Sequence, residues 1–379
     1  MTCATSSQPP NASCVSCSGS CRIWPRSTGL RPMTADTRGE EIAFATSGST
    51  GSPARWWRTV VQIRAEVALV AAELGAVGQI VNFAPTGHLY GHLYGTVLPE
   101  LIDVPVHHGW RHPAAVPNIR TGTPTLLVCL PSSWPIVRSM AAMLAGLPSV
   151  TALHGTGPVT AAARTTAERL ASPRFHPVEI FGSTETGAIA TRTIAAEDNQ
   201  PWTLLPDVQL ITDRNDGPQP LHVRSPRLAR HETTPHYPQA LHLDDLVEPL
   251  PHRRFRHLGR VSRLIKVNGV RCNLDQIEAS LHRLHSDSEF ACVAATDELR
   301  GEHYDLYYSS PPSGPGTREI WSSFQQVLGS SPLPRRIHRV ETLRRSATGK
   351  VLADQLYERN RPETHRQETT SRARQRVRL

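Results

Sequence analysis

Short apolar runs alternate with longer amphipathic segments between residues 41 and 181, and this alternation limits the possible folds more than any other feature. Runs such as Ile80–Ala84 and Leu126–Leu130 have the length of buried strands, whereas Trp57–Leu74 has the apolar spacing of a helix. Strands that alternate with long helices are typical of a parallel sheet covered by helices. The sequence therefore predicts an α/β fold. Further strands are expected at Ile42–Ala45, Val150–Leu153 and Val178–Phe181, and further helices at Trp134–Leu144 and Thr160–Leu170.

The pattern changes after Trp202, where short alternating segments broken by turns predict an antiparallel, β-rich subdomain that ends near residue 258. A compact α+β pattern follows Arg260 and predicts a small mobile C-terminal domain. Its elements are expected at Leu274–Leu284, Phe290–Ala295, Asp305–Ser309, Arg318–Leu328 and Arg336–Val340. We thus divide the chain into a flexible leader (1–40), a large N-terminal domain (41–260), a C-terminal domain (261–357) and a basic disordered tail (358–379).

The formal net charge of +8 is concentrated at one end of the chain. Residues 358–379 contain seven Arg and three Glu, which is half of that charge, in a segment with few apolar residues. The rest of the chain has no stripe of basic and aromatic residues, so we expect no nucleic-acid partner. Apolar runs are too short to span a membrane, and the N-terminus lacks the order of a secretory signal, so we expect a cytoplasmic protein without a membrane span.

Four of the seven cysteines lie in the first twenty-one residues. Cys14, Cys17 and Cys21 approach the spacing of a zinc site, but no second pair and no nearby histidine completes it. An unfolded leader is the plainer interpretation. Cys129, Cys272 and Cys292 are expected to be reduced core residues.

Two motifs follow predicted strands and contain residues suited to phosphate. Thr46–Pro53 reads TSGSTGSP, and its glycines and hydroxyls would let backbone and side-chain donors surround phosphate oxygens, although such runs also form ordinary loops. Ile180–Gly187 reads IFGSTETG, in which Glu185 would hold Mg²⁺ against a nucleotide, or would be the first acid of a helix.

Two later motifs contain an acid and a lysine. Asp245, followed by Arg260, would bind a ribose diol, or the two would form a surface pair at a turn. Lys350 ends the small-residue segment Ser346–Gly349 and, taken alone, is a solvated lysine.

The order and spacing of these four motifs resemble those of the ANL superfamily of adenylate-forming enzymes, from about Ile42 to Leu356. This superfamily includes acyl- and aryl-CoA synthetases, adenylation domains and luciferases. The short length and the GSTETG sequence look most similar to the small aryl-acid ligases of aryl-polyene and xanthomonadin-type pathways. The resemblance implies an AMP-binding N-terminal domain and a smaller C-terminal domain.

The resemblance also implies roles for individual residues. Lys350, Glu185 and Thr184 would be catalytic, with Glu185 also the metal ligand, and His88, Tyr90 and Gly182 would line the acid pocket. The remaining implied residues bind nucleotide or cofactor: Thr46, Ser47, Gly48, Ser49, Thr50, Gly51, Gly155, Thr156, Gly157, Gly182, Ser183, Asp245, Arg260 and Lys266. Ser262 occupies the place of the family's hinge residue.

The Gly87–Gly95 segment repeats the unit GHLY. Its two histidines, His88 and His92, would share a helical face and could bind a metal. The alternative, which the resemblance favours, is a wall of the acid pocket.

The implied activity is ATP-dependent conversion of an aryl or acyl acid to acyl-AMP, followed by transfer to CoA or to the phosphopantetheine thiol of an acyl carrier protein. ATP, Mg²⁺ and the thiol are the implied cofactors. Three departures from the family pattern bear on this: Ala54 follows Pro53 where the family has lysine, Leu243-Asp244 replaces Thr-Gly, and only about forty residues precede the phosphate loop. The alternative is a non-catalytic or truncated remnant that only binds nucleotide.

Overall fold

A computed structural model describes residues 39–45, 54–111, 117, 119–195, 200–212, 217–267, 270–297, 301–327 and 332–344. The predictions for the leader up to residue 38, for the Thr46–Pro53 loop, for Lys350 and for the basic tail lie outside these residues. Among the described residues, no helix combines the length and apolar character needed to cross a membrane.

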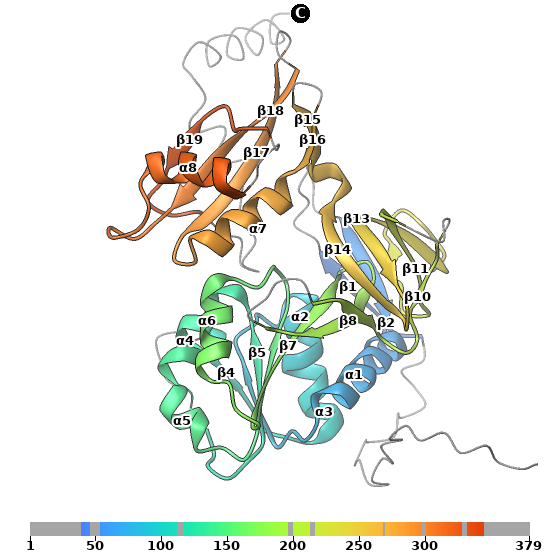
Figure 1. Cartoon of the computed structure of the whole chain (residues 1–379). Coiled ribbons are helices and arrows are strands. Elements are labelled where there is room, and N and C mark those ends of the chain that lie inside the picture. Colours follow the sequence, from blue (N-terminus) through green and yellow to red (C-terminus); the bar gives the residue numbers. More distant parts are fainter. Residues whose placement is uncertain are drawn as a thin grey trace, which may run out of the picture.

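One sheet of eleven strands organises the large N-terminal part, in the order β10-β11-β13-β14-β9-β8-β7-β6-β5-β3-β4 (Figure 1). Its parallel half pairs neighbouring strands in register, for example Leu126 with Thr151. The parallel strands are β3 (Gln79–Asn82), β4 (Val106–His108), β5 (Thr125–Cys129), β6 (Val150–His154) and β7 (Phe175–Ser183). The predicted parallel sheet is therefore confirmed.

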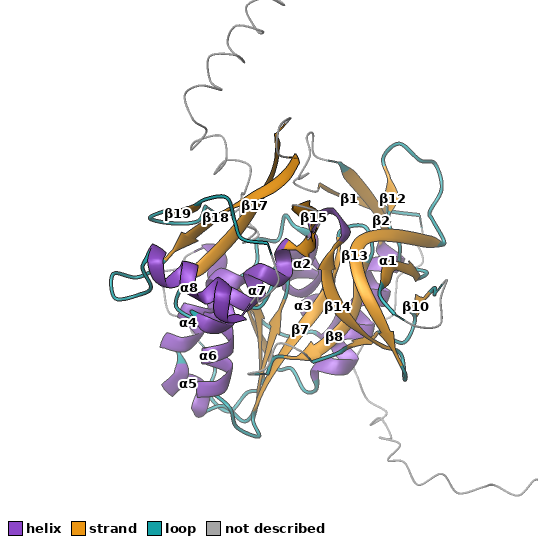
Figure 2. Ribbon diagram, turned by 45° about the horizontal axis from the view of Figure 1, so that its top comes forward, coloured by secondary structure: helices purple, strands orange, loops and turns teal. Residues whose placement is uncertain are grey.

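Helices cover both faces of this half of the sheet, as Figures 1 and 2 show. One face packs against α1 (Val60–Leu74), α2 (Leu89–His92), the π-helical segment Leu93–Val97 and α3 (Leu98–Ile102). The other packs against α4 (Trp134–Ser139), α5 (Ala141–Ala145) and α6 (Ala161–Arg169). Side chains that alternate along a strand enter opposite clusters: Leu126 and Val128 face α1, whereas Leu127 faces α4. Short 3₁₀ turns occur at Gly109–Arg111 and Pro131–Ser133.

The antiparallel strands continue the same sheet, because β8 pairs with β7 on one side and with β9 on the other. They are β8 (Gly187–Thr193), β9 (Trp202–Leu204), β10 (Gln209–Leu210), β11 (Gln219–Arg224), β13 (Ala240–Leu250) and β14 (Arg254–Arg260). A separate small sheet contains β1 (Glu41–Ala45), β2 (Arg55–Thr59) and β12 (Arg230–His231). The predicted β-rich region is thus present and hydrogen-bonded to the parallel strands through β8.

Two predicted helices have different limits in the structure. The prediction of a helix from Trp57 is wrong at its start, because residues 55–59 pair with β1 and the helix begins at Val60. Thr59 caps it: its hydroxyl accepts from the Gln62 N–H, and the Gln62 side chain accepts from the Thr59 N–H. The predicted Trp134–Leu144 helix is divided at Met140 into α4 and α5.

The C-terminal part has its own hydrophobic cluster and lies at the top of Figure 1. After the 3₁₀ turn Val261–Arg263 come β15 (Leu264–Val267), β16 (Val270–Asn273), α7 (Leu274–Leu284), β17 (Glu289–Asp297), β18 (Gly301–Ser309), α8 (Thr317–Val327) and β19 (Ile337–Arg339). β17 and β18 pair antiparallel, and β18 and β19 pair parallel. The structure thus has the predicted α+β arrangement after the large sheet.

Candidate functional site

The carboxyl ends of parallel strands meet at one edge of the sheet, which is where ligands bind in open α/β folds. Three predicted segments leave from this edge. His88 and Tyr90 follow β3, Gly155–Gly157 follows β6, and Ser183 ends β7 with Thr184–Thr186 directly after it. The Tyr90 ring lies against Gly155, since a Cβ atom on Gly155 would come within 2.5 Å of it. The structure therefore places the three segments at one edge of the sheet, with Tyr90 in contact with Gly155.

The turn after β7 has a close-packed backbone that needs its glycines. A Cβ atom on Gly182 would lie 2.1 Å from the Gly187 carbonyl oxygen, where the β7–β8 pairing shifts register. Within the turn the Thr186 hydroxyl accepts from the Ser183 N–H at 3.1 Å and donates to the Gly187 carbonyl at 2.8 Å. These contacts fix the backbone on both sides of Thr184 and Glu185.

Glu185 is partly buried in this turn, and its backbone carbonyl accepts from the Ala229 N–H at 2.8 Å. Its carboxylate makes no hydrogen bond or ion pair with any described residue. The alternative that Glu185 begins a helix is wrong, because residues 184–186 form a turn between two antiparallel strands. The turn therefore presents a carboxylate and the Thr184 hydroxyl on a rigid backbone.

The loop after β6 is held by a buried histidine. The His154 Nδ1 atom accepts from the Trp134 indole N–H at 2.9 Å, so the ring proton is on Nε2, which donates to the Gly157 carbonyl at 3.0 Å. Burial lowers the pKa of His154 from 6.5 to about 4 and keeps the ring neutral. Thr156 has a positive φ of 72°, an uncommon conformation for a residue with a side chain. Neutral His154 thus fixes the backbone of the predicted Gly155–Gly157 nucleotide segment.

We expect the low pKa of His154 to make stability depend on pH. Between pH 6.5 and 4 the unfolded chain binds a proton at His154 that the folded chain does not. The free energy of unfolding should therefore fall by up to about 3 kcal/mol as the pH is lowered from 6.5 to 4. His154→Gln should flatten this part of the curve, measured by urea unfolding at several pH values. His176→Gln, an exposed site on β7, serves as the control and should keep the slope. An unchanged slope in His154→Gln would refute the assignment.

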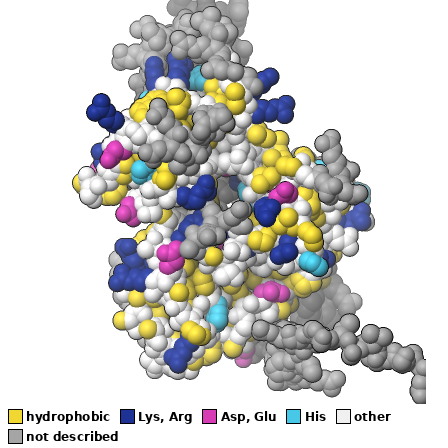
Figure 3. Space-filling model, in the orientation of Figure 1, with side chains coloured by type: hydrophobic (Ala, Val, Ile, Leu, Met, Phe, Trp, Pro, Cys, Tyr) yellow, Lys and Arg dark blue, Asp and Glu magenta, His cyan; other side chains and the backbone are white. Residues whose placement is uncertain are grey.

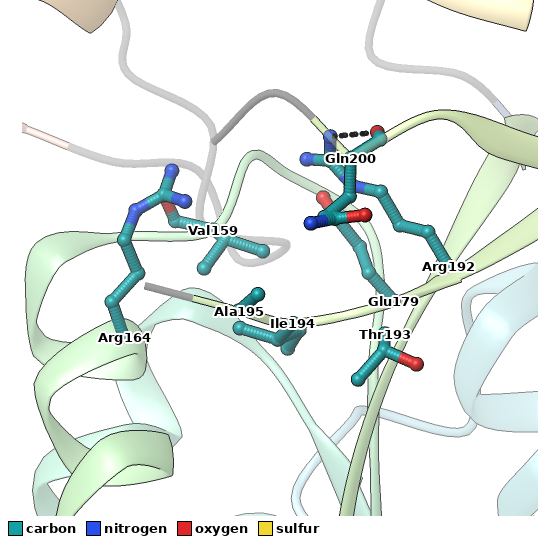
Figure 4. Close-up of a pocket in the computed structure, with 8 residues that line it drawn as sticks. All are labelled: Val159, Arg164, Glu179, Arg192, Thr193, Ile194, Ala195 and Gln200. Atoms are coloured by element: carbon teal, nitrogen blue, oxygen red, sulfur yellow. Dashed lines mark hydrogen bonds and ion pairs between the residues drawn. The ribbon is translucent and has the colours of Figure 1, made fainter. Parts of the chain in front are cut away.

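A cavity of about 10 Å³ lies beyond this loop, lined by the eight residues drawn in Figure 4. Arg192 lies on one side of it with Glu179 and Gln200, and Arg164 lies on the other (Figure 4). The Arg192 guanidinium donates to the Glu179 carboxylate at 2.5 Å and lies 4.3 Å from the centre of the Trp202 ring. Such a volume holds at most one water molecule, so this cavity is not a nucleotide site.

Asp245 and Arg260 are directly opposite each other on β13 and β14. The Asp245 carboxylate accepts from the His257 Nε2 atom at 2.8 Å, and the His257 ring packs against Phe181 at 5.2 Å. Phe181 immediately precedes Gly182, so these contacts connect Asp245 to the turn after β7. The alternative of a turn acid paired with Arg260 is wrong, because Asp245 lies within a strand and its partner is His257.

Ser262 and Lys266 lie where the chain enters the C-terminal part. The Ser262 N–H donates to Asp244 Oδ1 at 2.9 Å, and its hydroxyl donates to Asp244 Oδ2. Lys266 is exposed on β15, and its N–H donates to Glu302 at 2.8 Å. The Lys266 ammonium makes no polar contact with a described residue, so the structure does not join it to the residues at the sheet edge.

The GHLY repeat places its glycines at close contacts. A Cβ atom on Gly91 would lie 2.1 Å from the Pro85 carbonyl oxygen, and one on Gly95 would lie 2.0 Å from the Asn82 side chain. The Tyr90 hydroxyl donates to the Leu153 carbonyl at 2.7 Å. Among the described residues, no group of three or more His, Cys, Asp or Glu side chains could hold a metal ion.

Sequence reasoning missed a buried cluster of charged residues beneath the turn after β7. Arg58 on β2, Glu66 on α1, Asp207 and Arg227 come from four segments. Arg58, Glu66 and Arg227 are each no more than 1% exposed. Glu66 is the residue from which the sequence could have indicated this cluster, because it lies on the apolar face of its helix between Ile63 and Val70.

Comparisons with known proteins agree with this fold, although no family model matches the chain. The 4-coumarate–CoA ligases of Halorhodospira halophila and Rhodobacter capsulatus are each 27% identical to it, over 269 and 275 residues. These matches cover 70% and 71% of this chain but only 61% and 64% of the relatives, so the chain spans less than two thirds of their length.

Solved structures with similar folds cover 83% of the chain. ATP-bound MatB from Rhodopseudomonas palustris aligns with a TM-score of 0.67 at 15% identity, over 67% of its length. MenE from Bacillus subtilis, an o-succinylbenzoate–CoA synthetase in complex with its acyl-adenylate intermediate, aligns with a TM-score of 0.66 at 16% identity, over 68% of its length. In its fold and in these partial sequence matches, the chain is similar to adenylate-forming enzymes of the ANL superfamily.

Proposed function

We propose that the chain activates a small aryl or acyl acid with ATP and Mg²⁺, and transfers the acyl group to the thiol of CoA or of a carrier protein's phosphopantetheine. The names of its curated relatives, which are CoA ligases, support this function. The observation that carries it is the Glu185 carboxylate beside Thr184, which has no polar partner among the residues that the structure describes and lies at the sheet edge where the loops after β3, β6 and β7 converge.

The donors present fit Mg²⁺ bound with a nucleotide. Magnesium in nucleotide sites is commonly held by one or two carboxylates together with substrate phosphates and water. Glu185 supplies such a carboxylate from a rigid turn, so in this proposal it holds the ion. Bound there, Mg²⁺ would neutralise phosphate charge as pyrophosphate leaves.

The other predicted residues take their roles around this centre. Gly155–Gly157 lies beside the adenine, and Asp245 with Arg260 binds the ribose. Thr184 and Ser183 bind the α-phosphate, and residues 46–51 bind the β- and γ-phosphates. His88, Tyr90 and Gly182 border the acid. Lys350 bridges the acid and the α-phosphate, and Lys266 belongs to the thiol-transfer step.

The chemistry has two balanced steps. A carboxylate oxygen of the acid attacks the α-phosphorus of ATP, and the bond to the β-phosphate oxygen breaks, which gives acyl-AMP and pyrophosphate. The thiol, losing its proton, then attacks the acyl carbon, and AMP leaves with the oxygen that came from the acid. The protein contributes position and positive charge rather than a covalent intermediate.

Acid-dependent exchange of labelled pyrophosphate into ATP tests this proposal. We expect exchange with at least one member of a panel that includes 4-coumarate, hydroxybenzoates and medium-chain fatty acids. Binding of MgATP without exchange for any acid would contradict the ligase and favour the alternative of a nucleotide-binding remnant.

A further inference from the structure

The buried charged cluster beneath the turn after β7 has two positive and two negative members. Glu66 Oε2 is 2.7 Å from an Arg58 Nη2 atom and 3.0 Å from Arg227 Nη1. The Arg227 guanidinium also donates to both Asp207 carboxylate oxygens, at 2.6 and 2.9 Å. Because opposite charges are matched and share hydrogen bonds, the cluster is tolerated in the interior.

Two of these side chains hold the backbone that follows Glu185. The Ala188 N–H donates to Glu66 Oε1 at 2.7 Å, and the Ala188 carbonyl accepts from Arg227 Nη2 at 2.8 Å. Both polar groups of this peptide residue are therefore bound by the cluster. Gly187 packs directly against the cluster, because a Cβ atom at this position would lie 2.0 Å from Glu66 Oε2 and 2.6 Å from the Arg58 guanidinium.

The same cluster connects the turn to the strand that follows the Ser/Thr/Gly loop. Arg58 lies on β2, three residues after Arg55, which pairs with Ala45 at the end of β1. Its Nη2 donates to the Arg227 carbonyl at 2.8 Å, and Ala229, two residues further along, donates to the Glu185 carbonyl. β2 and the turn at Glu185 thus share one buried support.

The buried charges of this cluster are better explained by fixed geometry than by stability. Buried ion pairs contribute little net stability compared with apolar residues of the same volume, whereas they fix geometry through directed hydrogen bonds. A cluster that binds both polar groups of Ala188 restricts where Thr184 and Glu185 can lie. This restriction matters for catalysis, because a small displacement of a group that positions the nucleotide lowers the reaction rate strongly.

We propose that Glu66, Arg58 and Arg227 are positioning residues that hold the Ser183–Gly187 turn against β2, so that Thr184 and Glu185 are held in place to bind MgATP. The part of this inference that concerns MgATP rests on the proposed function. The structural part, that the cluster holds the turn, stands on the contacts alone.

Amide hydrogen exchange of the full-length chain tests the structural part without any activity. In Glu66→Gln the peptide spanning residues 183–190 should exchange at least about tenfold faster, because the charge that binds Arg58 and Arg227 is lost, while β6 stays protected. Arg227→Lys is a second variant that keeps the charge and the fold but cannot reach Glu66, Asp207 and Ala188 at once. Val67→Ala, a buried neighbour on α1, is the matched control for lost packing and should leave residues 183–190 unchanged.

Pyrophosphate exchange then tests the link to the nucleotide. Glu66→Gln and Arg227→Lys should lose roughly 10- to 30-fold in kcat and need more Mg²⁺ for half-maximal rate, with KM for the acid within about threefold. Unchanged exchange at 183–190, or the same change in Val67→Ala, would overturn the positioning role. A loosened turn with an unaltered magnesium requirement would overturn its link to Glu185. If the wild-type chain shows no acid-dependent activity, the proposed function fails, and hydrogen exchange still decides whether the cluster holds the turn.

Discussion

Lys350→Ala should nearly abolish acid-dependent pyrophosphate exchange while leaving thiol transfer from a supplied acyl-adenylate close to the wild-type rate. The Lys350 ammonium is assigned to the developing charge between the acid and the α-phosphate. One well-placed donor of this kind is worth about 3–4 kcal/mol, or roughly 10²–10³-fold in rate. Thiol attack on the acyl carbon does not use this charge, so the two half-reactions should separate.

The chain offers an unusually clean control, because its only lysines are Lys266 and Lys350. Lys266→Ala should show the reverse pattern, with normal exchange and slower transfer, since Lys266 is assigned to the thiol step. Quenched-flow measurement of each half-reaction in both variants gives the comparison. Equal loss of both steps in Lys350→Ala would point to a folding defect, and retention of both would show Lys350 to be a solvated residue outside the reaction.

Glu185→Gln should lower adenylate formation by about 10²-fold or more. The substitution keeps the size and the backbone contact to Ala229 but removes the charge assigned to Mg²⁺. Initial rates measured over a range of Mg²⁺ concentrations should show that excess metal restores part of the activity. Glu168→Gln, at an exposed position on α6, is the control for loss of one carboxylate and should behave as wild type. Activity of Glu185→Gln within a factor of two of wild type would exclude this residue from the site.

The elements that the sequence predicted well are those that local pattern and burial decide together. The limits of α7 agree with its prediction, because Asn273 caps the first turn and the apolar stripe of Leu274, Ile277 and Leu281 ends at Leu284. The fully buried strands β5 and β6 were apparent as short apolar runs. The resemblance implied site roles for residues after three different strands, and in the structure the segments that follow β3, β6 and β7 lie at the same edge of the sheet.

The rest depended on contacts between distant residues. Residues 55–59 have the apolar content of a helix start, and only pairing with β1 and β12 makes them a strand. The His257 partner of Asp245 is set by the register of β13 with β14, which a single sequence does not fix. The Arg58–Glu66–Arg227 cluster joins side chains up to 169 positions apart.

An oxygen-label experiment tests the central claim, that the acid is activated as an acyl-adenylate, most directly. The acid that supports pyrophosphate exchange is supplied with ¹⁸O in its carboxylate, together with ATP, Mg²⁺ and CoA, and the nucleotide product is analysed by mass spectrometry. We expect thioester and AMP that carries one labelled oxygen, because the carboxylate oxygen that attacks the α-phosphorus leaves with AMP. Unlabelled AMP, or ADP with labelled inorganic phosphate, would contradict adenylate formation.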